Sequence, residues 1–92
     1  MAAERYTVVL TPHALRGLKQ IRDHAIRRRL GAAIDDLQIN PRPPGCKILR
    51  DDHVTAYRVR VGDYRILYTV EDKIVQVTAV TVGHRRDVYR RL

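Results

Sequence analysis

Three arginines near the middle of the chain have a spacing that could bind phosphate. Residues 56–68 alternate apolar and charged side chains on either side of a Gly-Asp pair, which is typical of a β-hairpin with a two-residue turn. Because side chains alternate across a strand, this hairpin would gather Arg58, Arg60 and Arg65 on one face. Like charges side by side repel, so the pattern favours a bound polyanion; a solvated outer face is the alternative.

The carboxy-terminal segment adds groups that could move a proton. After Gly83 the chain carries one histidine, one tyrosine and four arginines. Arginine is a poor general base because its pKa exceeds ~12, so proton transfer would fall to Tyr89 or His84. Nearby guanidinium groups would lower the pKa of Tyr89. Two simpler roles stay open: Tyr89 as an apolar anchor and His84 as a hydrogen-bonding residue at a strand end.

Together these groups suit the cleavage of a phosphodiester, and of RNA in particular. RNA carries its own nucleophile in the 2′-OH, so a protein without metal ligands could cleave it by in-line attack. The arginines would hold the scissile phosphate and stabilise the charge that develops in the transition state, while His84 or Tyr89 would exchange the proton.

Two turns set the predicted register of the sheet that carries these residues. The first would pair Val61 with Tyr64, Arg60 with Arg65, Val59 with Ile66, and Tyr57 with Tyr68. A second two-residue turn at Asp72 and Lys73 would pair Val70 with Val75, Tyr68 with Val77, and Ile66 with Ala79. Both turns bring apolar partners onto one face. Leu67, Val80 and Val82 would then share the arginine face, so a tail, a partner or other strands must cover part of it.

The first half of the chain predicts the elements that cover the apolar face. Residues 6–10 form a β-branched run typical of a strand. Apolar residues at helical spacing over 15–21 and 26–37 predict two helices, with Thr11 and Asp23 as their N-caps. The predicted fold class is α+β: an N-terminal strand, a two-helix hairpin, then an antiparallel meander of three to four strands with the helices on one face.

Composition narrows the class of protein. The 92 residues are expected to form one domain, 1–92, and the net charge of +8 points to nucleic acid, an acidic protein or an anionic surface as partner. The single cysteine, Cys46, excludes an internal disulfide, and the scattered histidines show no ligand spacing, so we expect no metal and no cofactor. Without an apolar signal segment or a membrane-spanning stretch, we expect a cytoplasmic protein.

Two motifs resemble those of a known family. The chain reads Tyr-Arg-Val-Arg-Val-Gly-Asp-Tyr-Arg-Ile-Leu-Tyr over 57–68 and Val-Thr-Val-Gly-His-Arg-Arg-Asp-Val-Tyr-Arg over 80–90. Together they resemble the RelE/ParE superfamily of bacterial type II toxin–antitoxin systems, and RelE-type toxins most closely. The resemblance implies a microbial RNase-like fold and an mRNA interferase that cuts translated message in the ribosomal A site. It places the family's functional residues at Arg58, Arg60, Arg65, Arg85 and Tyr89. We therefore expect the catalytic residues to be Arg65, Arg85, Tyr89 and His84, and the residues that bind RNA or phosphate to be Arg58, Arg60 and Arg86.

The resemblance also names partners and alternatives. It implies inhibition by a cognate antitoxin, and the charge of the chain suggests an acidic, partly disordered one that forms a hetero-oligomeric complex. The ribosome and mRNA are the other expected partners, and no membrane is expected. Because the superfamily also contains ParE-type inhibitors of DNA gyrase, inhibition by protein contact is an alternative function, as is a catalytically weak basic binding module.

Overall fold

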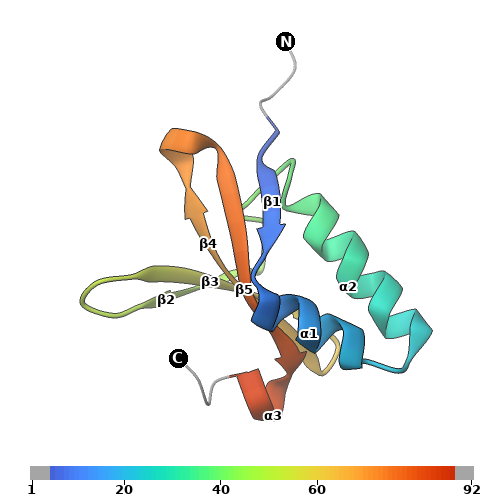
Figure 1. The fold of residues 1–92 in the computed structure, drawn as a ribbon. Helices are drawn as coiled ribbons and strands as arrows, with labels where there is room; N and C mark the ends of the chain where they lie inside the picture. Colours follow the sequence, from blue (N-terminus) through green and yellow to red (C-terminus); the bar gives the residue numbers. More distant parts are fainter. Residues whose placement is uncertain (1–4, 89–92) are drawn as a thin grey trace.

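A five-stranded sheet forms the centre of the structure, a computed structural model that describes residues 5–88 (Figure 1). In chain order the elements are β1 (Thr7–Leu10), α1 (Pro12–Gln20), α2 (His24–Asp36), β2 (Lys47–Arg50), β3 (Thr55–Val61), β4 (Tyr64–Glu71), a 3₁₀ turn (Asp72–Ile74), β5 (Gln76–His84) and α3 (Arg85–Val88). The strand order is β1-β5-β4-β3-β2, with β1 parallel to β5 and all other neighbours antiparallel. The predicted α+β class, with its N-terminal strand, two-helix hairpin and meander, is confirmed.

Both predicted helix caps are present. Thr11 accepts a hydrogen bond at Oγ1 from the Ala14 N–H at 3.1 Å, and Pro12 begins α1, where its missing N–H costs nothing. The Asp23 carboxylate accepts from the first N–H groups of α2 at 2.9 and 3.3 Å. These local bonds determine where each helix begins. No helix within residues 5–88 has the length and apolar character needed to cross a membrane.

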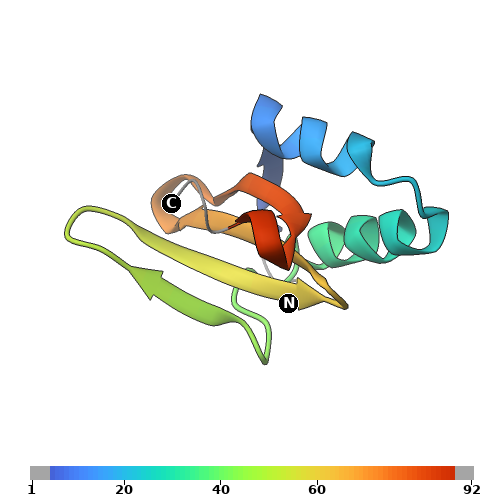
Figure 2. The ribbon, with the colours of Figure 1, turned by 90° about the horizontal axis from the view of Figure 1, so that it is seen from below.

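The main core lies between the sheet and the pair α1 and α2. Leu30 of α2 and Leu37, directly after this helix, pack with Ile66 and Tyr68 of β4. All four side chains are fully buried or nearly so. Burying one such side chain contributes about 1.5–3 kcal/mol. The hairpin of β2 and β3 forms the edge of the sheet farthest from β1 and extends away from both helices, as the two views of the ribbon show (Figures 1 and 2).

The first hairpin forms as predicted. Val61 pairs with Tyr64, Arg60 with Arg65, Val59 with Ile66, and Tyr57 with Tyr68. Gly62 takes the positive φ of 59° that a two-residue turn of this kind needs. The arginine-bearing face and the apolar face of the hairpin are therefore those expected from the alternation of its residues.

The predicted register of the second hairpin is wrong. Residues 72–74 form a 3₁₀ turn and Val75 takes a left-handed conformation with φ of 52°, so the connection is longer than two residues. Opposite partners are instead Val70 with Val77, Tyr68 with Ala79, and Ile66 with Val82. An irregularity at Leu67 and Tyr68 leaves Val80 as an extra residue in β5. This bulge turns Val82 onto the core face, where it is 3% exposed, instead of the arginine face.

The short helix α3 covers part of the arginine face. It packs against β4 and β5, and a Cβ atom built on Gly83 would lie 3.4 Å from a methyl group of Val88. Gly83 and Leu67 project from the face opposite to Val82 and Ile66, so α3 lies across the sheet from α1 and α2. Leu67 and Val88 are buried there. A tail, a partner or other strands were the coverings expected for this face, and the structure shows the segment Arg85–Val88 there.

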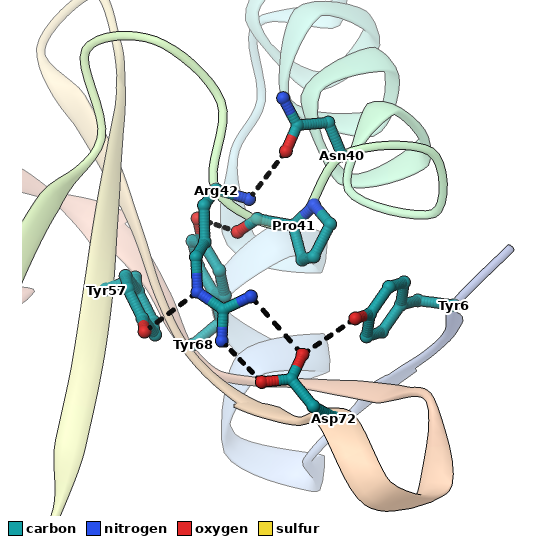
Figure 3. Close-up of polar contacts among 7 residues, drawn as sticks. All are labelled: Tyr6, Asn40, Pro41, Arg42, Tyr57, Tyr68 and Asp72. Carbon is teal, nitrogen blue, oxygen red and sulfur yellow. Dashed lines mark hydrogen bonds and ion pairs between the residues drawn. The ribbon is translucent and has the colours of Figure 1, made fainter. Parts of the chain in front are cut away.

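A polar cluster that the sequence analysis missed ties four segments together at one end of the sheet (Figure 3). Arg42 pairs with the Asp72 carboxylate at 2.8 and 3.3 Å and donates from Nε to Tyr57 Oη at 3.0 Å. Tyr6 donates from its hydroxyl to Asp72 at 2.7 Å. The hydrogen bonds from Arg42 and Tyr6 lower the pKa of Asp72, and the bond to Asp72 raises the pKa of Tyr6. Beneath this cluster, the buried Tyr68 hydroxyl donates to the Pro41 carbonyl at 2.7 Å.

Candidate active site

The structure brings the three hairpin arginines together on one face of the sheet. Arg60 lies directly opposite Arg65 across β3 and β4, and Arg58 lies two residues before Arg60 on the same face. This face is the one opposite α1 and α2, because the alternating residues Val59 and Ile66 point into the main core. The predicted cluster of guanidinium groups therefore exists as a surface of β3 and β4.

The three arginines differ in exposure, and the most buried one is held by the turn. Arg65 is only 8% exposed, whereas Arg60 is exposed and Arg58 is half-buried. Arg65 donates from Nη1 to the carbonyl oxygens of Gly62 and Tyr64, both at 2.9 Å. The hairpin turn thus fixes the guanidinium in place, which is useful for a group that must meet a developing charge.

One nitrogen of Arg65 lacks an acceptor. Its Nε is buried and has no hydrogen-bond partner among the residues that the structure describes. A buried donor left without an acceptor costs about 1–3 kcal/mol, so such groups call for an explanation in terms of a ligand, water or function. An anion on this face would supply an acceptor where the fold provides none.

Arg85 lies at the same end of the sheet as Arg65. The backbone N–H of Arg85 donates to the Asp63 carbonyl at 2.8 Å, which joins the start of α3 to the hairpin turn. The Arg85 side chain is 3.9 Å from the Asp63 carboxylate and 56% exposed, so this ion pair is weak and leaves the guanidinium accessible. Arg86 follows it and is also exposed. Asp63 was recognised in the sequence only as a turn residue.

His84 lies on the other side of the sheet from Arg60 and Arg65. It pairs with Tyr64, on the face that carries Ile66, and their rings meet edge to face with centroids 5.4 Å apart. The Arg86 N–H donates to His84 Nδ1 at 3.2 Å, which leaves the proton of a neutral imidazole on Nε2. The fold therefore does not bring His84 beside the arginine pair.

Tyr89, the expected base, lies outside the described residues, so the structure does not place it. Between residues 5 and 88 no group of three or more His, Cys, Asp or Glu side chains could hold a metal ion. Chemically, the described part of the site can bind and polarise a phosphate through guanidinium groups.

Comparisons with known proteins agree with this fold. Residues 8–89 match the family described as the ParE toxin of the type II toxin–antitoxin system, parDE. The chain is 35% identical over 86 residues to Toxin RelG of Mycobacterium tuberculosis, covering 94% of this chain and 98% of that protein.

Solved structures of toxin–antitoxin complexes have the same fold. The RelBE2 complex of Mycobacterium tuberculosis matches with a TM-score of 0.76 and 31% identity, over 90% of this chain and 94% of the matched chain. The archaeal RelE–RelB complex of Pyrococcus horikoshii matches with a TM-score of 0.78 and 25% identity, over 91% and 99% of the two chains. With a family match across nearly its whole length and a close relative among toxins, the chain belongs to the RelE/ParE superfamily of type II toxin–antitoxin toxins.

Proposed function

We propose that this toxin is a metal-independent endoribonuclease that cuts mRNA on the ribosome and so inhibits translation. The observation that carries the proposal is the buried Arg65, held by the hairpin turn opposite Arg60, with one donor that finds no acceptor among residues 5–88. A phosphodiester oxygen is an acceptor that would satisfy it. The similarity to proteins named RelE and RelG supports RNA cleavage over other uses of the same scaffold.

The proposed reaction uses the nucleophile of the RNA itself. The 2′-oxygen attacks the adjacent phosphorus, the bond from phosphorus to the 5′-oxygen breaks, and the products are a 2′,3′-cyclic phosphate and a 5′-hydroxyl. Arg65 and Arg85 stabilise the added negative charge at the phosphorus, while Arg58, Arg60 and Arg86 hold neighbouring phosphates.

Proton transfer completes this reaction. We assign removal of the 2′-OH proton to Tyr89, and a proton must also reach the leaving 5′-oxygen. His84 is a second candidate for acid or base, although it would have to reach the phosphate around the end of β5, because the sheet separates it from Arg65. The pH dependence of cleavage in Tyr89→Phe and His84→Ala variants distinguishes the two assignments.

We propose that a cognate antitoxin neutralises the toxin, as in the RelE–RelB complexes that share its fold. A net charge of +8 favours an acidic partner segment, and the ribosome would be contacted through the phosphates of its RNA. The association rate with the antitoxin is then expected to fall as salt is added, since screening weakens electrostatic steering. A rate that does not change with salt contradicts steering by charge.

Primer extension on a translated reporter mRNA tests the proposed function. Wild-type toxin is expected to produce new cuts within the reading frame, and an Arg60→Gln/Arg65→Gln variant is expected to lose most of them. Arg50→Gln is the matched control, because Arg50 is an exposed arginine on β2, on the face opposite the arginine cluster. Cuts that persist in the double variant would show that the arginine face is not the cleavage site.

A second candidate function is inhibition of DNA gyrase by protein contact. The family match described as ParE toxin favours it. In that case message stays intact while plasmid supercoiling decreases in the same cells. If neither changes, the arginine face is the surface of a basic binding module without catalytic activity.

A further inference from the structure

A groove of about 510 Å³ lies along the edge of β5, between α1 on one side of the sheet and α3 on the other. β1 pairs with β5 only as far as Ala79, so from Val80 to His84 the edge of β5 that faces away from β4 has no described strand beside it. Helix α1 lies along this part of β5 instead. The Thr11 hydroxyl donates to the Val80 carbonyl at 3.0 Å, which helps fix the position of the helix.

The walls of this groove combine positive charge with aromatic rings. Its chemistry-bearing side chains are His13, Arg16, Arg22, Tyr64, His84 and Asp87. Arg16 and Arg22 are exposed, and Asp87 is the one carboxylate among the lining residues. The imidazole of His84 contacts the Tyr64 ring edge to face and, as a neutral ring, keeps an N–H at Nε2 to donate.

Guanidinium groups beside aromatic rings are the means by which proteins bind single-stranded nucleic acid. The cations contact phosphates, and the rings stack on bases without requiring a particular sequence. An acidic peptide would need only the cations. The Tyr64 and His84 rings therefore favour a nucleotide over a protein segment as the ligand.

The groove is next to the arginine face, because it runs around the edge of β5 and is lined by residues from both faces of that strand. Gly83 is opposite Arg65 on one face, and the following residue, His84, is opposite Tyr64 in the groove. Arg85 and Arg86 are exposed directly after them, where the chain leaves the sheet. A strand of RNA held at Arg65 would meet these two guanidinium groups on its way to the groove.

We propose that this groove binds nucleotides of single-stranded RNA that flank the phosphate held on the arginine face. The inference rests on the proposed endoribonuclease function and deepens it, because it makes the binding site longer than the cleavage site. Arg16 and Arg22 contact the phosphates of the flanking nucleotides, and the rings of Tyr64 and His84 contact a base.

Binding of two RNA lengths tests this proposal. The probes are a fluorescent trinucleotide and a fluorescent nonanucleotide, both of single-stranded RNA with 2′-O-methyl groups that prevent cleavage. In anisotropy titrations an Arg16→Gln/Arg22→Gln variant is expected to bind the nonanucleotide about tenfold more weakly and the trinucleotide as wild type does. Loss of two phosphate contacts on a single strand makes the negative slope of log K against log salt shallower by about 1.4. Arg50→Gln is the control for the loss of an exposed arginine, and thermal melting verifies that each variant is folded.

The outcomes separate this inference from the proposed function. If wild-type toxin binds both RNAs and the double variant binds the nonanucleotide equally well, the groove does not bind RNA and only the inference is overturned. If wild-type toxin binds neither RNA, the inference is overturned, whereas the proposed function fails only if primer extension on a translated message shows no cuts. If the double variant keeps its RNA affinity but loses affinity for the antitoxin, the groove is a protein-binding site and the inference is wrong.

Discussion

The same substitution is expected to have opposite effects at two helical glycines. Gly17 in α1 faces β5, and a Cβ atom built there would collide with the Val82 carbonyl oxygen and lie 3.1 Å from its carbon. Gly31 in α2 has no heavy atom within 4 Å of the corresponding position, outside its own helix. Gly17→Ala and Gly31→Ala therefore change helix propensity equally and packing very differently.

The size of each effect follows from these surroundings. Alanine in place of glycine stabilises a helix by about 0.8–1 kcal/mol, so Gly31→Ala is expected to raise the free energy of unfolding by nearly that amount. At Gly17 the colliding atom belongs to backbone and cannot rotate away, so α1 must move off β5. Overpacking of this kind costs about 1–3 kcal/mol, so after the helical gain is subtracted the net loss is up to about 2 kcal/mol.

Urea unfolding of the purified protein measures both variants. The midpoint is expected to rise for Gly31→Ala and to fall for Gly17→Ala, with the slope m unchanged. In thermal unfolding, 1 kcal/mol corresponds to about 4–8 °C for a protein of this size. A Gly17→Ala protein as stable as Gly31→Ala would refute the close packing of α1 on β5, and with it the fixed wall of the groove described above.

Three further predictions concern polar contacts. Tyr68→Phe removes the hydrogen bond to the Pro41 carbonyl and is expected to lower the free energy of unfolding by about 1 kcal/mol in urea titrations; an unchanged midpoint contradicts the bond. Arg42 and Tyr6 lower the pKa of Asp72 in the folded state. Asp72 therefore contributes stability that is fully present above its unfolded pKa near ~4. This stability is lost as the pH falls through the lowered pKa of the folded state. The melting temperature of Asp72→Asn should therefore fall less steeply than that of wild type between neutral and strongly acidic pH, and parallel curves argue against the ion pair. Asp63→Asn is expected to change the free energy of unfolding by less than about 0.5 kcal/mol, because its ion pair with Arg85 is long and exposed, and a larger loss in urea titrations would show a tighter contact.

Local patterns in the sequence predicted the first hairpin and both helix caps correctly. The alternation over residues 56–68 and the glycine in its turn are enough to set which side chains share a face, because strand geometry has a period of two. Thr11 and Asp23 bond to backbone groups two or three residues away. Such interactions depend on neighbours in the chain and can be recognised without a tertiary structure.

The second register could not be predicted in the same way. A shift of two residues keeps Val77 and Ala79 on the core face, so alternation alone cannot distinguish the predicted pairing from the observed one. The bulge at Val80 then reverses the faces of all later residues in β5. This reversal places Val82 in the core and His84 on the helical side, away from the arginine pair.

Residue order over short spans was enough to predict the α+β class, the shared face of Arg58, Arg60 and Arg65, and the resemblance to RelE/ParE toxins. Tertiary structure decided which arginine is buried, which face α3 covers, and why α1 carries a glycine at position 17. It also decided the contact between Arg42 and Asp72, which are thirty residues apart. These features depend on how distant segments approach one another. That approach is set by turn geometry, a bulge and close packing, which the periodicity of the chain does not encode.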